Sequence, residues 1–153
     1  MDNKLTKILG TKYPLIQGGM AWVADAYLAA AVSNGGGLGL IAAGGMNEDL
    51  LRKEISLAKT LTDKPFGVNI MLMNPCAAGL AEVLIEEGVA VVTTGAGSPG
   101  KFIENWKKAG IVVIPVVAST GLAKRMESLG ADAVVAEGCE AGGHIGEITT
   151  MAL

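Results

Sequence analysis

Six short runs of almost uninterrupted apolar residues recur along the chain, separated by stretches with helical spacing. The runs are Leu15–Gln17, Leu38–Ile41, Phe66–Ile70, Val89–Val92, Ile111–Ile114 and Ala133–Ala136. They do not alternate with polar residues, which is typical of parallel strands covered on both faces. The regular spacing of the runs predicts a repeating strand–helix unit.

The stretches between the apolar runs carry helix signals. Asn47 is a capping residue with two acidic residues directly after it, and an amphipathic stretch follows. Ser98 stands before Pro99, a pair that predicts a capped helix with proline in its first turn. Three glycines are expected just past helix ends, before the next strand: Gly88, Gly110 and Gly130.

Six such units with right-handed crossovers predict either a closed barrel or an open doubly wound sheet. The segment Gly95–Gly100 matches GxGxxG between a strand and a helix, which is the context of a dinucleotide fold. However, the following strand runs into Val116–Thr120 with no acidic residue for a ribose. We therefore expect an α/β fold of the (β/α)8 TIM-barrel type, with this chain supplying about six of the eight units.

Polar residues and glycines follow the predicted strands directly, so they would gather at the C-terminal mouth of the barrel, where barrel active sites form. These segments are Gln17–Met20, Ala42–Gly45, Asn69–Met71, Thr93–Gly95 and Glu137–His144. This set of residues suits a flat heteroaromatic cofactor such as a flavin. It combines glycines, polarizable methionines and the hydrogen-bonding side chains of Gln17, Asn69 and Glu137. Alternatively, the methionines fill the core, Asn69 ties a turn and Glu137 caps.

His144 is the only histidine of the 153 residues and lies in a glycine-rich loop after a predicted strand. Its unperturbed pKa of about 6.5 suits proton transfer near neutral pH, so it is the candidate catalytic residue. The alternative is an incidental surface histidine. A nucleophilic pair of Cys139 with His144 has no support beyond proximity in the sequence.

Composition narrows the function classes. The formal net charge is −3 and no basic cluster exists, so we expect no nucleic acid and no membrane surface as partner. The longest uncharged run, Ala26–Asn47, is interrupted by Ser33–Gly37, which breaks a spanning helix. Cys76 and Cys139 form neither a zinc pattern nor a disulfide framework, and the start shows no signal peptide. These features predict a cytoplasmic protein without a metal site.

Four ordered motifs carry a family resemblance: Pro14–Trp22, Lys64–Asn69, Val91–Gly97 and Glu140–Gly146. Together they resemble the FMN-dependent group of nitronate monooxygenases and FabK-type enoyl-acyl-carrier-protein reductases, from about Tyr13 to the end of the chain. Gln17–Ala24 and Asn69–Leu72 are more similar to the reductase branch.

The resemblance implies an FMN-binding barrel and a role for each matching residue. Asn69 and Glu137 would hydrogen-bond the flavin ring, and His144 would stand at its reactive face. The residues that line the flavin would be Gly18, Gly19, Met20 and Ala21, and Gly142 and Gly143 would pass close beneath the ring. Gln17, Thr94 and Gly95, at the same strand ends, complete the expected cofactor-binding set.

The implied reaction passes a hydride from NADH or NADPH through FMN to the β-carbon of an enoyl thioester on acyl carrier protein. Two alternatives stay open: oxidation of nitronates with FMN and O2, and a fragment unable to hold FMN alone. Flavin phosphate in such barrels rests on the loops after strands seven and eight. We therefore expect residues 1–153 to be the N-terminal part of the barrel, without those loops or any C-terminal lid, and the complete protein to be a homodimer.

Overall fold

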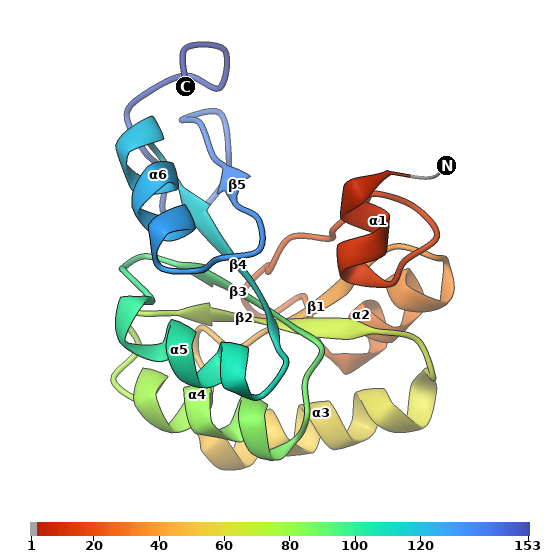
Figure 1. Cartoon of the computed structure of the whole chain (residues 1–153). Coiled ribbons are helices and arrows are strands. Elements are labelled where there is room, and N and C mark those ends of the chain that lie inside the picture. Colours follow the sequence, from red (N-terminus) through yellow and green to blue (C-terminus); the bar gives the residue numbers. More distant parts are fainter. Residues whose placement is uncertain (1–2) are drawn as a thin grey trace.

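A parallel sheet with helices packed along it forms the protein, and the computed structural model describes residues 3–153 of it (Figure 1). The strands of this part are β1 (Gly39–Ala42), β2 (Phe66–Met71), β3 (Val91–Gly95), β4 (Val112–Val117) and β5 (Val135–Ala136). The helices are α1 (Lys4–Leu9), α2 (Ala26–Asn34), α3 (Glu48–Leu61), α4 (Ala77–Glu86), α5 (Gly100–Lys108) and α6 (Thr120–Ser128). Strands and helices alternate from α2 onward, as the apolar runs predict.

The sheet is parallel throughout, and its strand order is β1-β2-β3-β4-β5. A doubly wound sheet reverses its order at a switch point, whereas a (β/α) barrel adds each strand beside the one before it. The observed order is that of the barrel, which confirms the predicted fold class and excludes the open-sheet alternative.

Two apolar clusters occupy opposite faces of the sheet. The larger cluster joins Ile41, Val68, Val92 and Val113 to residues of helices α2 to α6. The smaller cluster joins Leu40, Val91 and Ile114 to Leu9 of α1. Figure 1 shows α3, α4 and α5 along one side of the sheet and α1 on the other. We call the face with Leu40, Val91 and Ile114 the inner face.

Five of the six predicted strands form with shifted ends, but Leu15–Gln17 contributes only an isolated parallel bridge, Ile16 to Leu38. The reason lies in Gln17. The Leu40 N–H donates to the side-chain Oε1 of Gln17 at 3.0 Å. This amide takes the place of a main-chain acceptor, so the ladder ends there and the chain turns away through Gly18.

Helix ends follow the predictions at four of five positions. The Asn47 side chain accepts from the Leu50 N–H at 3.0 Å and caps α3. Gly88, Gly110 and Gly130 all have positive φ just past α4, α5 and α6. Each donates its N–H to the carbonyl three residues back, and the next residue donates to the carbonyl five back, as in a Schellman motif.

The predicted cap at Ser98 is wrong. Helix α5 begins at Gly100, and the position before it is Pro99, with φ −79° and ψ 4° and no side-chain cap bond. A capping residue normally has an extended backbone, which places its side chain over the first free N–H groups. The chain reaches α5 already curled, so Ser98 lies too early to cap it.

Helix α2 packs unusually close to β1. A Cβ added at Gly39 would lie 1.9 Å from the carbonyl oxygen of Ala29 in α2. Only glycine fits between this strand and this helix. None of the helices described between residues 3 and 153 combines the length and the apolar character that a membrane crossing requires.

Candidate functional site

Asn69 and Thr93 form the polar centre of the inner face. They are register partners on the parallel strands β2 and β3, and the Thr93 hydroxyl donates to Oδ1 of Asn69 at 2.9 Å. Thr93 is buried and Asn69 is half-buried. Because Oδ1 is engaged, the amide nitrogen of Asn69 is the atom available to donate to a ligand.

The Gly18–Met20 segment lies against Asn69, as the sequence predicts. A Cβ added at Gly19 would lie 2.6 Å from Cβ of Asn69. Residues far apart in the sequence therefore meet at the C-terminal end of β2. The carbonyl of Met20 accepts from the N–H groups of Val23 and Ala24, at 3.1 and 2.8 Å, so a tight turn holds the segment.

Three glycines of the predicted set have no structural need to be glycine. A Cβ at Gly18, Gly95 or Gly142 would meet no atom within 4 Å, and none of the three has a positive φ. Gly143 differs, because its φ of +85° favours glycine on its own. A planar ligand can approach the backbone closely only where no side chain stands in the way. The fold itself does not require glycine at Gly18, Gly95 or Gly142, so these positions fit FMN.

Thr94, a member of the expected cofactor-binding set, turns its side chain away from the inner face. Side chains alternate along a strand, so Thr93 faces the inner cluster with Val91, and Thr94 faces the helices with Val92. Thr94 is 1 % exposed, and its hydroxyl has no partner within the described part of the chain. Thr93 is therefore the threonine whose hydroxyl faces the inner face, and a contact of Thr94 with the cofactor would have to come from its backbone.

We expect Thr94→Val to raise the free energy of unfolding by about 1 kcal/mol, because it replaces a buried, unpaired hydroxyl with a methyl group of similar shape. Urea denaturation measures the change. Flavin affinity should stay at the wild-type value, since the side chain points toward the helices. A tenfold loss of flavin affinity would return Thr94 to the site.

His144 lies in an exposed loop beyond β5, at the same edge of the sheet as the ends of β2 and β4. A Cβ at Gly146 would lie 2.6 Å from Cβ of Ala118, so the loop rests against the segment that follows β4. Glu137 starts this loop, half-buried, and its N–H donates to the carbonyl of Val117 at 2.9 Å. Within residues 3–153, no hydrogen bond joins the His144 ring to Asn69 or Gly19.

Sequence reasoning missed Trp22. Its φ is +65°, a conformation that costs a bulky residue energy, and its side chain is 90 % exposed. A Cβ added at Gly45 would lie 3.0 Å from the Trp22 ring, which therefore covers the loop after β1. Residues held in strained backbone conformations cluster at active sites, which makes Trp22 a further candidate for the site. Their signal is a backbone angle, which composition and spacing do not carry.

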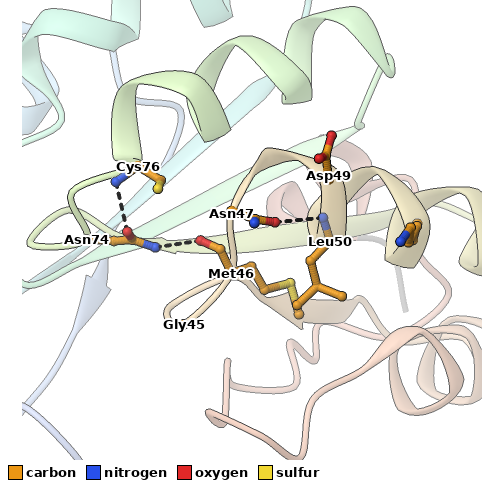
Figure 2. Close-up of a pocket in the computed structure, with 8 residues that line it drawn as sticks. Gly45, Met46, Asn47, Asp49, Leu50, Asn74 and Cys76 are labelled. Carbon is orange, nitrogen blue, oxygen red and sulfur yellow. Dashed lines mark hydrogen bonds between the residues drawn. The ribbon is translucent and has the colours of Figure 1, made fainter.

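A surface hollow of about 520 Å³ lies between the loops after β1 and β2 (Figure 2). Asn74 holds it together: its Nδ2 donates to the carbonyl of Met46 at 2.9 Å and its Oδ1 accepts from the N–H of Cys76 at 2.9 Å. Gly45 and Leu50 line it as well. None of the residues expected to bind FMN lines this hollow, so it is separate from the inner-face site.

Charge at the site is sparse. The N–H of Thr150 donates to the Glu140 carboxylate and holds the pKa of Glu140 below its usual range. Lys107 and Lys108 of α5 pair with Asp132 and Glu104. Across residues 3–153, no group of three His, Cys, Asp or Glu side chains is placed to hold a metal ion.

Comparison with known proteins gives consistent matches. The family model described as nitronate monooxygenase matches residues 2–83 and 76–153. FabK from Thermotoga maritima has a solved structure that is 55 % identical, with a TM-score of 0.98, covering 100 % of this chain and 49 % of that one.

Curated relatives include the (3aS,4S,5R,7aS)-5-hydroxy-7a-methyl-1-oxo-octahydro-1H-indene-4-carboxyl-CoA dehydrogenase of Mycobacterium tuberculosis, 41 % identical over 97 % of this chain and 42 % of the relative. A nitronate monooxygenase of Paraburkholderia phytofirmans is 35 % identical over 93 % of this chain and 50 % of its own. The chain thus spans about half the length of these relatives. A family model that matches nearly every residue and the structural likeness to FabK lead to one conclusion. The chain belongs to the nitronate monooxygenase family, whose FabK and nitronate monooxygenase members are flavin-dependent oxidoreductases.

Proposed function

We propose that this chain is part of a flavin-dependent enoyl-acyl-carrier-protein reductase. The observation that carries the proposal is the likeness to FabK, which is 55 % identical over the whole chain with a TM-score of 0.98. The curated relative at 41 % identity is named for a carboxyl-CoA compound, which also favours a thioester substrate. The nitronate monooxygenase relative is less similar, at 35 % identity.

FMN would rest on bare backbone in this site. Gly18 and Gly95 would approach one part of the ring, and Gly142 and Gly143 another, because no side chain fills the space beside Gly18, Gly95 or Gly142. The Asn69 amide nitrogen would donate to an acceptor on the ring, with its orientation fixed by Thr93. When bound, FMN carries the hydride from NADH or NADPH to the β-carbon of the thioester.

His144 would act at the substrate. Reduction of an enoyl thioester places negative charge on the thioester oxygen and needs a proton at the α-carbon. An imidazole at that position donates the proton or hydrogen-bonds the oxygen, and either contribution is worth about 10² to 10⁴ in rate. The ring is exposed and free of protein partners in the described part of the chain, so it is accessible to a substrate.

We expect Gly18→Ala to weaken flavin binding by about tenfold or more, which is about 1.4 kcal/mol, because its methyl group would stand between the backbone and the ring. The same methyl group meets no protein atom within 4 Å, so the free energy of unfolding of the flavin-free protein should hardly change. Flavin fluorescence titration and urea denaturation measure the two quantities.

Gly121→Ala is the matched control, because a Cβ at Gly121 would meet the Ser119 hydroxyl oxygen only at 4.0 Å, an ordinary contact, and Gly121 lies in α6, outside the proposed site. It should leave flavin affinity unchanged. Equal flavin affinity in the Gly18→Ala variant and the wild type would show that the ring does not lie against Gly18.

Nitronate monooxygenase activity is the second candidate, because that family model matches nearly the whole chain. In that reaction the loop histidine would serve as a base or charge partner for the nitronate, and O2 would reoxidise the flavin. An acidic carrier protein as partner and a homodimer of the complete protein remain part of the proposal for the reductase.

The deciding experiment supplies the complete protein with two sets of reactants. One is a crotonyl thioester, on CoA and on carrier protein, with NADH or NADPH and without oxygen; the other is a nitroalkane with O2. We expect oxidation of the nicotinamide cofactor that depends on the thioester. Turnover of the nitroalkane alone would reject the reductase in favour of the monooxygenase.

A further inference from the structure

The loop that carries His144 is closed at its base by two contacts. The N–H of Cys139 donates to the carbonyl of Ile148 at 2.9 Å. One carboxylate oxygen of Glu140, Oε2, accepts from both the N–H and the hydroxyl of Thr150, each at 2.9 Å. These contacts bring together residues about ten positions apart and close the loop into a ring.

Between these contacts the loop has little else to hold it. In the part of the chain that the structure describes, residues 142–147 form no hydrogen bond, and most of them are exposed. The loop touches the rest of the protein at Gly146, which lies against Ala118. The closure at its base therefore decides where Gly142, Gly143 and His144 lie.

Thr150 is seated tightly at the base. A Cβ added at Gly138 would lie 2.3 Å from both the nitrogen and the hydroxyl oxygen of Thr150. Glycine at position 138 thus makes room for Thr150 beside Glu140. The sequence pattern of the loop shows the glycines, but only the structure shows that one of them accommodates Thr150.

Glu140 has no charged partner among the described residues. Within them it forms no ion pair, and it has a long contact with the Cys139 thiol at 3.8 Å. A carboxylate that accepts two hydrogen bonds at one oxygen makes a stronger clamp than a neutral acceptor. Thr150 is thus the partner of this carboxylate that lies far from it in the sequence, since its other contacts are with its own N–H and with the adjacent Cys139.

We propose that Glu140 is a positioning residue, whose carboxylate closes the loop on Thr150 and thereby holds His144 and the adjacent glycine backbone in place for the reaction. The catalytic part of this inference rests on the proposed function. The closure itself does not, because it concerns only how the chain folds on itself.

The experiment compares four variants of the complete flavin-bound protein: Glu140→Ala, Glu140→Gln, Thr150→Val and Thr150→Ser. Hydrogen exchange of the peptide covering residues 141–147 reports loop opening without reference to activity. We expect exchange to be about tenfold faster in Glu140→Ala and Thr150→Val, which remove one or both hydrogen bonds to a charged group. Thr150→Ser keeps the charged acceptor and both donors, so exchange should stay near the wild-type rate. Glu140→Gln keeps an acceptor but loses its charge, so its exchange should lie between the wild-type rate and that of Glu140→Ala.

Activity supplies the second measurement. With a crotonyl thioester, kcat should fall about tenfold in Glu140→Ala and Thr150→Val while KM changes little. Thr150→Ser should restore most of kcat, and Glu140→Gln should restore part of it. Unchanged exchange in both Glu140→Ala and Thr150→Val would overturn the proposal. A loss of kcat with unchanged exchange would also overturn it, since Glu140 would then act directly.

Failure of the proposed function is a separate outcome. If the wild type does not reduce the thioester, the exchange comparison still decides whether Glu140 closes the loop. If Glu140→Ala does not fold, the pair Thr150→Val and Thr150→Ser decides, because it removes and restores a single hydroxyl group. Equal hydrogen-exchange rates of residues 141–147 in Thr150→Val and Thr150→Ser would overturn the proposal that Glu140 closes the loop.

Discussion

Replacing His144 by alanine is expected to lower turnover of an enoyl thioester by at least tenfold, because a positioned proton donor contributes about 10² to 10⁴ to the rate. Flavin should remain bound, because His144 is exposed and makes no hydrogen bond within residues 3–153. Steady-state kinetics of the complete enzyme measure the first quantity, and the visible flavin absorbance of the same samples measures the second.

His144→Gln separates the two possible tasks of the imidazole. A glutamine amide can hydrogen-bond a thioester oxygen, but it cannot give up a proton at neutral pH. If His144 stabilises charge on the oxygen, the glutamine variant should recover much of the lost rate. If His144 donates a proton, the glutamine variant should be as slow as the alanine variant. Unchanged turnover of His144→Ala would remove the residue from the mechanism.

We expect Gly39→Ala to destabilise the fold by about 3 kcal/mol or more, the upper end of the cost of overpacking. The added methyl group would lie 1.9 Å from the Ala29 carbonyl oxygen and 2.5 Å from its carbon, which are main-chain atoms of α2. Neither β1 nor α2 can move away without opening the larger apolar cluster. Urea denaturation followed by circular dichroism measures the loss.

Gly79→Ala is the matched control for this prediction. Its Cβ would lie 1.8 Å from Oε1 of Glu48, which is the far end of a flexible side chain that can swing into solvent. Gly79 is also inside α4, where alanine is better than glycine by about 1 kcal/mol. The variant should be as stable as the wild type or more so. Similar losses in both variants would show that closeness to main-chain atoms is not what matters.

Much of the fold is predictable because its signals are local. Apolar runs such as Phe66–Ile70 need cover on both faces, and only a layer of helices against a parallel sheet supplies it. The glycines at positions 88, 110 and 130 end helices because an L-residue resists the positive φ that the Schellman motif requires. Neither inference needs any knowledge of distant contacts.

The sequence predicts the meeting of Gly19 and Asn69 because that meeting depends only on where strands end. Parallel strands place their C-terminal ends at one edge, so Gly19 and Asn69 meet although 50 positions separate them in the sequence. The roles of individual residues at the site are still predictions.

The features that the sequence does not show depend on fine geometric detail. Strand phase separates Thr93 from Thr94, and a shift of one residue reverses which side chain faces inward. Gln17 ends its strand through a side-chain bond that imitates the ladder, and Ser98 precedes a backbone that is already curled. The contact of Glu140 with Thr150 joins residues whose closeness depends on the whole course of the loop.

The strand order has a consequence for how the protein forms during its synthesis. Each strand pairs with the one made just before it, so a newly made strand finds its partner already in place, only one strand–helix unit away. Bringing together ends so close in sequence costs little loop-closure entropy. As the polypeptide leaves the ribosome from its N-terminus, the sheet can therefore grow one strand at a time, before translation is finished.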